Sequence, residues 1–170
     1  MKRSIPRRSY SQLMNIGDLL SPERVAEHAD VTSKKRVLEL LAEMIAGASP
    51  QLSRSEVFES LLNRERLGST GLGRGVALPH GRLTGIQQTI GAFIRLTAAV
   101  NFDAPDDQPV DLLFALIVPE QCTDTHLQML AQLAEMFGDQ HMLKRLRSAQ
   151  DTPALLTAIR AWQPEHQAAF

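Results

Sequence analysis

The stretch of residues 110–118 constrains the fold of this chain more than any other part of the sequence. It is apolar throughout except for Asp111. Its uninterrupted part, residues 112–118, is far shorter than the roughly 20 residues that a membrane-crossing helix needs. A short apolar run of this kind predicts a strand in the middle of a sheet that is covered on both faces. We therefore expect a layered domain built around this strand, and no membrane insertion.

Other strands are predicted at residues 24–28, 76–78 and 89–96, where the apolar runs are short and bounded by polar or turn-forming residues. Residues 101–108 supply the turn before the central strand. Two helices are predicted ahead of residue 68. Thr32 or Ser33 can cap the first, and Ser53 with Glu56 forms the S-x-x-E capping box of the second.

The last third of the chain predicts helices. The first of them is expected to bury one apolar face, made of Leu127, Leu130, Ala131, Ala134 and Phe137. Two shorter helices follow, and the last can begin at Asp151 or Thr152 with Pro153 at its first position. Helices, then strands, then helices predict the α/β (α+β layered) class, with a mixed central β-sheet flanked by helices.

Length, charge and cysteine content indicate the number of domains, the kind of partner and the cellular location. The 170 residues suffice for one domain, and we expect a flexible basic N-terminal arm over residues 1–15, a single domain over residues 16–162 and a frayed tail over residues 163–170. Lysine and arginine number 18 against 19 acidic residues, so no basic field is available for nucleic acid. The single Cys122 cannot form an internal disulfide, which favours a reducing, cytoplasmic location.

The segment of residues 68–81 is rich in glycine and is predicted to be a shaped loop. Glycines at alternate positions allow backbone N–H groups to converge on an anion, so we predict a phosphate-binding segment made of Ser69, Thr70, Gly71, Leu72 and Gly73. Arg64 or Arg66 can add a charged contact. The alternative is a glycine-rich turn between a helix and a strand, without a ligand.

His80 lies in the same segment, between Pro79 and Gly81. A neutral imidazole is a nucleophile near pH 7 and can form a covalent intermediate with a phosphoryl group. His126 lies near the start of a predicted helix, where a negative group is favoured. It is either a partner of the phosphate or an exposed histidine of the first helical turn, and spacing does not decide between them.

Residues 64–81, RERLGSTGLGRGVALPHG, resemble the signature of the enzyme IIA proteins of the bacterial phosphoenolpyruvate-dependent phosphotransferase system, fructose/mannitol branch. Residues 102–104, 108–116, 118–119 and 125–127 match further blocks of that family. The resemblance spans roughly residues 19–159 and is greatest to the stand-alone nitrogen-regulatory type.

The resemblance implies the fold of the mannitol/fructose-type enzyme IIA, and it implies that His80 is phosphorylated by an HPr-like carrier protein. It also implies that Arg64 and His126 line the site, that regulated cytoplasmic proteins are partners, and that no metal or organic cofactor takes part. Arg74 and Arg82 depart from the asparagine and lysine that relatives carry, which makes the rim of the site more basic.

Other enzyme classes fit the sequence less well. The glycine cluster lacks the G-K-[ST] ending of a P-loop, no two histidines have zinc-ligand spacing, and no G-x-S-x-G elbow is present. Two functions stay open. The chain is a regulator that acts through its phosphorylation state, or it is the enzyme IIA component of a sugar transport system that passes phosphate to an enzyme IIB.

Overall fold

The apolar run at residues 110–118 forms the central strand β6 (Val110–Pro119) of a mixed sheet. The computed structural model describes residues 15–164. The predicted arm up to residue 14 and the predicted tail from residue 165 lie outside the described residues. The first described residue, Asn15, accepts a hydrogen bond from the Gly17 N–H and so caps a short 3-10 helix, η1 (Ile16–Leu19).

The sheet has six strands in the order β1-β5-β6-β3-β2, and β4 also pairs with β6. The strands are β1 (Val25–Ala29), β2 (Gly71–Gly73), β3 (Val76–Ala77), β4 (His80–Leu83) and β5 (Ile90–Val100), besides β6. β6 runs antiparallel to β5 and parallel to β3 and β4. The predicted mixed sheet with a buried central strand is therefore confirmed.

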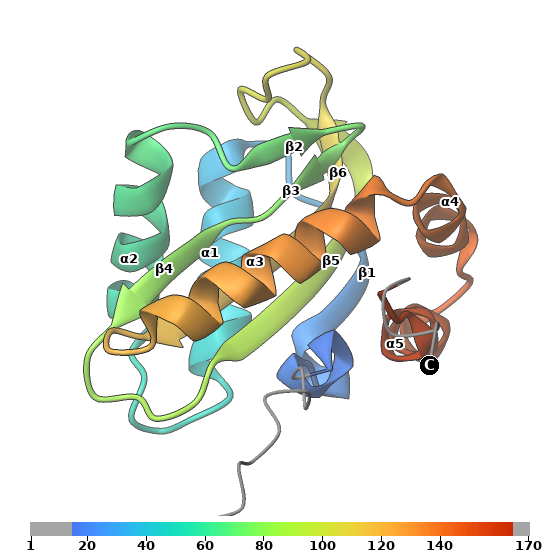
Figure 1. Cartoon of the computed structure of the whole chain (residues 1–170). Helices are drawn as coiled ribbons and strands as arrows, with labels where there is room; N and C mark the ends of the chain where they lie inside the picture. Colours follow the sequence, from blue (N-terminus) through green and yellow to red (C-terminus); the bar gives the residue numbers. More distant parts are fainter. Residues whose placement is uncertain (1–14, 165–170) are drawn as a thin grey trace, which may run out of the picture.

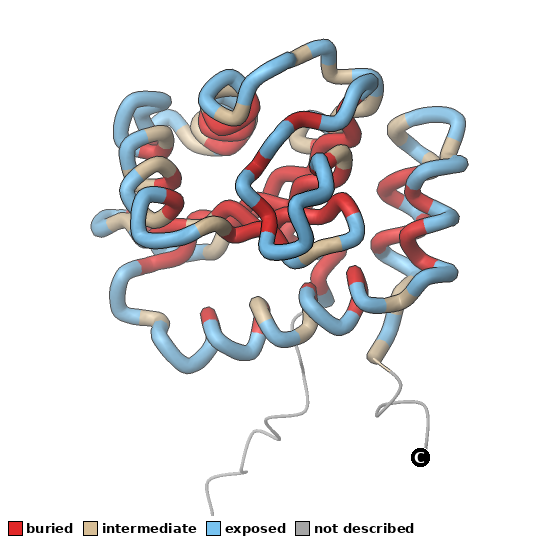
Figure 2. The backbone as a smooth tube through the Cα atoms, turned by 90° about the horizontal axis from the view of Figure 1, so that it is seen from above, coloured by how far each residue is buried: buried red, intermediate tan, exposed pale blue. Residues whose placement is uncertain are grey.

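Helices cover both faces of the sheet (Figure 1). α1 (Lys34–Ala46) and α2 (Arg54–Arg66) lie on one face. The other face carries α3 (Thr123–Gly138), α4 (Gln140–Ser148) and α5 (Thr152–Ala161), together with η1. A second 3-10 helix, η2 (Pro22–Arg24), directly precedes β1. The sheet is buried between these layers, whereas the helices expose their outer faces (Figure 2).

The alternation of side chains along β6 produces two separate hydrophobic clusters. Leu112, Phe114 and Leu116 pack toward α3, α4 and α5. The residues between them, Leu113 and Ala115, pack toward α1 and α2. Both faces of this strand are thus used for packing, which explains why its sequence is apolar without a period of two.

The predicted helix caps are present. Ser33 Oγ accepts the backbone N–H of Arg36, and Ser53 Oγ accepts the N–H of Glu56. At α5, Asp151 accepts the Ala154 N–H, with Pro153 in the first turn. Each cap satisfies a backbone donor that has no partner inside its helix.

The prediction of which side of α3 is buried is wrong. The buried residues of α3 are His126, Met129, Leu133, Met136 and Phe137. Of the predicted set only Phe137 is among them, and Leu127 is 63% exposed. The helix buries positions that include a histidine and two methionines, so the leucine and alanine pattern indicates the wrong side. His126 lies on the buried face of the helix.

The glycine-rich segment forms a β-hairpin. β2 and β3 pair antiparallel, and the two residues between them, Arg74 and Gly75, have φ of 59° and 81°. Left-handed conformations at both central residues are typical of the tight turns that suit hairpins. Gly73, with φ of 91°, continues this run, and the backbone N–H of Arg74 donates to Asp106 Oδ2 over 2.8 Å. The hairpin is followed along the chain by β4, whose first residue is His80.

Within residues 15–164, no helix is both long enough and apolar enough to cross a membrane.

Candidate functional site

His80 is fixed at the start of β4 by strand β6 on one side and by helix α2 on the other. The carbonyl of Pro79 accepts the N–H of Leu116, so the chain is paired with β6 immediately before the histidine. A Cβ added at Gly81 would collide with Ser60 of α2, so the chain after His80 packs directly on that helix. The imidazole is half-buried, and its direction is set by a rigid backbone.

The tautomer of His80 follows from one hydrogen bond. The Nδ1 atom lies 2.7 Å from the carbonyl oxygen of Leu78. A carbonyl oxygen only accepts, so Nδ1 carries the proton and donates it. The neutral ring then has its lone pair on Nε2. Nε2 is therefore the nucleophilic atom of this imidazole, a point that the sequence leaves open.

His126 lies beside His80. The two ring centroids are 5.3 Å apart, with an angle of 52° between the ring planes. His126 is only 4% exposed, and its Nδ1 atom is buried without a hydrogen-bond partner within residues 15–164. Of the two interpretations that spacing leaves open, the exposed histidine is wrong, because the side chain is buried at the site.

Burial holds both imidazoles in the neutral form. It is the main cause that lowers the pKa of His80, with Arg64 and Arg82 adding to it, while the Leu78 carbonyl and Glu65 act in the opposite direction. The pKa of His126 is lowered to about 4, first by burial and then by the charges on His80 and Arg82. Near pH 7 the site thus presents a neutral nucleophile beside a second neutral imidazole.

Arg64 supplies positive charge from the last turn of α2. Its Nη1 atom donates to the carbonyl of Gly68 over 2.9 Å, so the guanidinium is held against the end of its own helix. The charge lowers the pKa of His80, which places it within electrostatic reach of the imidazole. The structure therefore brings His80 and His126 together, with the charge of Arg64 close enough to act on His80, whereas Arg66 lines a hollow between α1 and α2.

The predicted phosphate-binding segment has protein partners for both of its hydroxyls. The Ser69 hydroxyl donates to the Phe102 carbonyl over 2.7 Å, and that of Thr70 donates to Glu65 over 2.6 Å. A hydroxyl has a single proton, so neither can donate to a phosphate while these bonds last. Gly71, Leu72 and Gly73 form β2, in which Gly71 packs closely against Ala104 and Leu72 is exposed.

Two residues of this region are missing from the sequence-based site. Glu65 is only 6% exposed, and its carboxylate accepts the N–H and the hydroxyl of Thr70. Lys34 reaches the same carboxylate from α1, with Nζ 2.9 Å from Oε1. A signal for Glu65 exists in the sequence, because Val57, Leu61 and Glu65 follow one another at a spacing of four on the buried face of α2.

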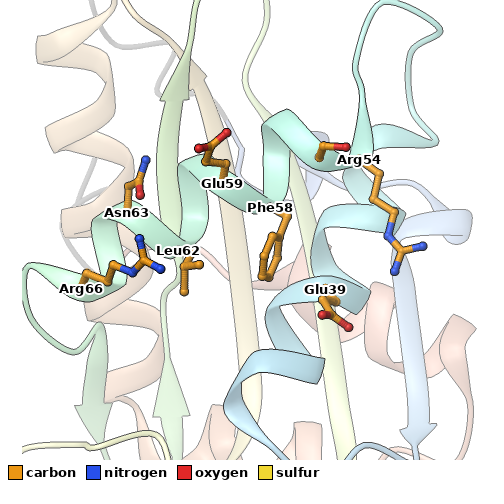
Figure 3. Close-up of a pocket in the computed structure, with 8 residues that line it drawn as sticks. Glu39, Arg54, Phe58, Glu59, Leu62, Asn63 and Arg66 are labelled. Carbon is orange, nitrogen blue, oxygen red and sulfur yellow. The ribbon is translucent and has the colours of Figure 1, made fainter.

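A hollow between α1 and α2 lies outside this site. It is lined by Glu39 of α1 and by residues of α2 that include Phe58 and Arg66 (Figure 3). Its lining offers carboxylates, guanidinium groups and apolar side chains rather than an imidazole. In the described part of the chain, no three histidine, cysteine or acidic side chains gather as metal ligands would. The chemistry of the described residues therefore centres on His80.

Comparisons with known proteins agree with this assignment of the fold. Residues 18–162 match the model of a family described as phosphoenolpyruvate-dependent sugar phosphotransferase system, EIIA 2. A nitrogen regulatory protein of Pseudomonas aeruginosa is 46% identical over 147 residues, which cover 86% of this chain and 96% of that protein.

Solved structures give the same picture. The nitrogen regulatory protein IIA-Ntr of Neisseria meningitidis superposes with a TM-score of 0.81 at 42% identity, covering 85% of this chain and 98% of its own. The mannitol enzyme IIA of Escherichia coli, solved in complex with its phosphorylated enzyme IIB, has a TM-score of 0.70 at 20% identity, covering 84% of this chain and 98% of its own. The second likeness concerns the fold alone.

Proposed function

Because the chain belongs to the EIIA 2 family of the phosphoenolpyruvate-dependent sugar phosphotransferase system, we propose that it carries a phosphoryl group on His80. The donor is an HPr-like carrier protein, and the phosphorylation state regulates cytoplasmic partner proteins. The observation that carries this proposal is the bond from His80 Nδ1 to the Leu78 carbonyl, which leaves Nε2 as a free nucleophile in a neutral ring.

The transfer step follows from this geometry. The lone pair of Nε2 forms the new N–P bond while the N–P bond of the donor phosphohistidine breaks, and the electron pair of that bond returns to the donor nitrogen. Nδ1 keeps its proton, and the Leu78 carbonyl stabilises the positive charge that develops on the ring. The reaction thus needs no separate base on this chain.

The charge of the transferred group also needs partners. Arg64 supplies a fixed positive charge, and such a group stabilises a phosphoryl group in transfer. The neutral ring of His126 carries one N–H that can donate to a phosphoryl oxygen. Phosphate binding by Ser69, Thr70, Gly71, Leu72 and Gly73 stays a prediction; with both hydroxyls bonded to protein, it would depend on backbone N–H groups.

Exposed apolar side chains favour a protein as the partner. Within the described residues, the large hydrophobic side chains that remain exposed are Leu67 at 85%, Leu127 at 63% and Leu72 at 45%. Leu127 follows His126 directly, and Leu67 follows the last turn of α2, which carries Arg64. Exposed apolar residues near a polar site are typical of surfaces that other proteins contact.

We propose the regulatory role because nitrogen regulatory proteins are 46% and 42% identical to this chain over most of their length. Phosphorylation adds about 1.5 to 2 negative charges and thereby changes which surfaces can dock at His80. We also propose that residues 16–162 act as one domain, supported by the sheet that both core clusters share.

The second candidate is a sugar-transport enzyme IIA that passes phosphate to an enzyme IIB, a role favoured by the family's description as a sugar phosphotransferase system. The test uses the phosphorylated protein, mixed in one arm with purified enzyme IIB domains of the fructose and mannitol types. In the other arm, the cytoplasmic proteins retained by the phosphorylated and unphosphorylated forms are compared. A regulator keeps its phosphate in the first arm and retains different proteins in the second. Rapid transfer to an enzyme IIB together with identical retained sets would assign the chain to transport.

A further inference from the structure

A continuous series of hydrogen bonds leads from α1 to the imidazole of His80. It begins at Lys34, whose Nζ atom lies 2.9 Å from Glu65 Oε1. Glu65 in turn accepts two hydrogen bonds from Thr70: the backbone N–H donates to Oε1 over 3.0 Å, and the hydroxyl donates to Oε2 over 2.6 Å. Both oxygens of this buried carboxylate therefore have partners.

The series continues through the backbone of the hairpin. The carbonyl of Thr70 accepts the N–H of Leu78 over 3.0 Å. The carbonyl of Leu78 then accepts the Nδ1–H of His80 over 2.7 Å. The residue that fixes the imidazole tautomer is thus itself fixed by Thr70, and Thr70 is fixed by Glu65.

We infer that Glu65, together with Lys34 and Thr70, is a positioning residue for phosphoryl transfer, because it holds Leu78 where its carbonyl keeps Nδ1 of His80 protonated. This inference rests on the proposed function of His80. Glu65 does not touch the reacting atoms, and it acts through Thr70 and Leu78.

The burial of Glu65 supports a specific role for this side chain. A carboxylate that is 6% exposed is costly to bury unless its oxygens are paired and hydrogen-bonded. Here every oxygen is satisfied, and a fully satisfied polar network holds its members in one arrangement. An apolar residue in its place would leave the Thr70 N–H and the Lys34 ammonium without these partners.

A second clamp holds the other side of the same segment. Ser69 Oγ donates to the Phe102 carbonyl and accepts the N–H of Gly71 over 3.1 Å. Lys34 reaches this side as well, because its Nζ atom lies 3.3 Å from the Phe102 carbonyl and 4.7 Å from the centre of the Phe102 ring. Thr70 is therefore held between α2 and the loop after β5, and it cannot move without breaking these contacts.

The variant that tests the inference must keep the charge of Glu65. The negative charge of Glu65 raises the pKa of His80, whereas the positive charges of Arg64 on α2 and Arg82 on β4 lower it. The ring of His126 on α3 also lies beside the His80 ring. A change at Glu65 would alter position and electrostatics together. Thr70→Val removes the hydroxyl donor at nearly constant volume, and Thr70→Ser restores it.

The experiment uses the full chain with ¹⁵N-labelled histidine, as the parent, Thr70→Val, Thr70→Ser and a control, Glu27→Gln. The control breaks another partly buried ion pair, in which Glu27 Oε2 lies 3.4 Å from Arg95 Nη2, on a different part of the sheet. The imidazole tautomers are read from long-range ¹H–¹⁵N NMR spectra of the unphosphorylated protein. The rate of phosphorylation by a phosphorylated HPr-like carrier is measured on the same samples.

We expect the Nδ1–H tautomer at His80 in the parent, in Thr70→Ser and in Glu27→Gln. In Thr70→Val we expect a mixture of tautomers and phosphorylation slowed by about tenfold or more, since small misplacements of reacting groups cost that much or more. An unchanged tautomer in folded Thr70→Val would overturn the inference, whatever its rate. If no variant accepts phosphate while the tautomer still changes in Thr70→Val, the proposed function fails, and only the role of Thr70 in setting the His80 tautomer stands.

Discussion

The imidazole rings of His80 and His126 lie with their centroids 5.3 Å apart, although one belongs to strand β4 and the other to helix α3. Two cationic rings at this distance would repel each other. The lowered pKa of each ring removes that repulsion near pH 7. The site can therefore hold a nucleophile and a neutral hydrogen-bond donor side by side.

His126→Leu should slow phosphorylation of His80 by about tenfold to a hundredfold, because it removes the imidazole N–H donor near the transferred group. The measurement is the time course with a phosphorylated HPr-like donor. His141→Gln on the exposed face of α4 is the matched control and should follow the parent. Identical time courses for the two variants would show that His126 does not contact the phosphoryl group.

The stability of the protein should fall as the pH drops from about 6.5 toward 4. In the unfolded chain His126 takes up a proton at its ordinary pKa of about 6.5, whereas in the folded protein it stays neutral until the pH falls to about 4. The unfolded state thus binds the extra proton over this window, and the free energy of unfolding falls by on the order of 3 kcal/mol at its acidic end. The lowered pKa of His80 acts in the same direction.

Urea unfolding at several pH values measures this effect. In His126→Gln the fall in the free energy of unfolding between pH 7 and pH 4.5 should be clearly smaller than in the parent. Parallel curves for the two proteins would mean that the His126 imidazole is not held neutral by burial.

Arg64→Gln should move the titration of His80 to higher pH, because the arginine charge lowers the pKa of that imidazole. The same change should slow phosphoryl transfer by about tenfold or more, since it removes charge that stabilises the group in transfer. NMR titration of the His80 ring and the transfer rate measure the two effects separately. A titration that stays in place or moves to lower pH would contradict the assigned role of Arg64.

Arg95→Met should destabilise the fold without altering transfer in the protein that remains folded. Arg95 is 8% exposed, and its Nη1 atom donates to the carbonyls of Leu146 and Ala149 over 2.8 and 2.6 Å. These bonds close the end of α4, and their loss should cost about 3 kcal/mol and lower Tm by roughly 6–12 °C. Arg36→Met breaks an exposed pair with Glu39 and should cost under about 1 kcal/mol. Equal losses in the two variants would refute the capping role.

Much of the fold could be predicted from local sequence patterns. The central strand, the caps at Ser33, Ser53 and Asp151, and the short strand before His80 all depend on neighbouring residues, and the structure confirms them. The buried face of α3 could not be predicted in this way. Leu127 is more apolar than His126, yet it is exposed at the site while His126 is buried beside His80.

The hydrogen-bond partners of the Ser69 and Thr70 hydroxyls could not be predicted from local sequence patterns either. A glycine-rich segment with hydroxyls indicates an anion-binding site, but the partners of these hydroxyls are set by the tertiary fold. Phe102 is 33 positions from Ser69 in the sequence. Glu65 is close to Thr70 in sequence, but its role depends on the buried face of α2 and on Lys34 from α1. Only the folded arrangement shows that these groups support the loop.

Intact-mass measurement shows whether His80 accepts the phosphoryl group. The parent, His80→Gln and the surface control His141→Gln are each incubated with phosphoenolpyruvate, the first enzyme of the phosphotransferase system and an HPr-like carrier. The parent and the control should gain the mass of one phosphoryl group, which acid removes and base preserves, as expected for an N–P bond. His80→Gln should gain none; phosphorylation of folded His80→Gln, or no gain by the parent, would contradict the account.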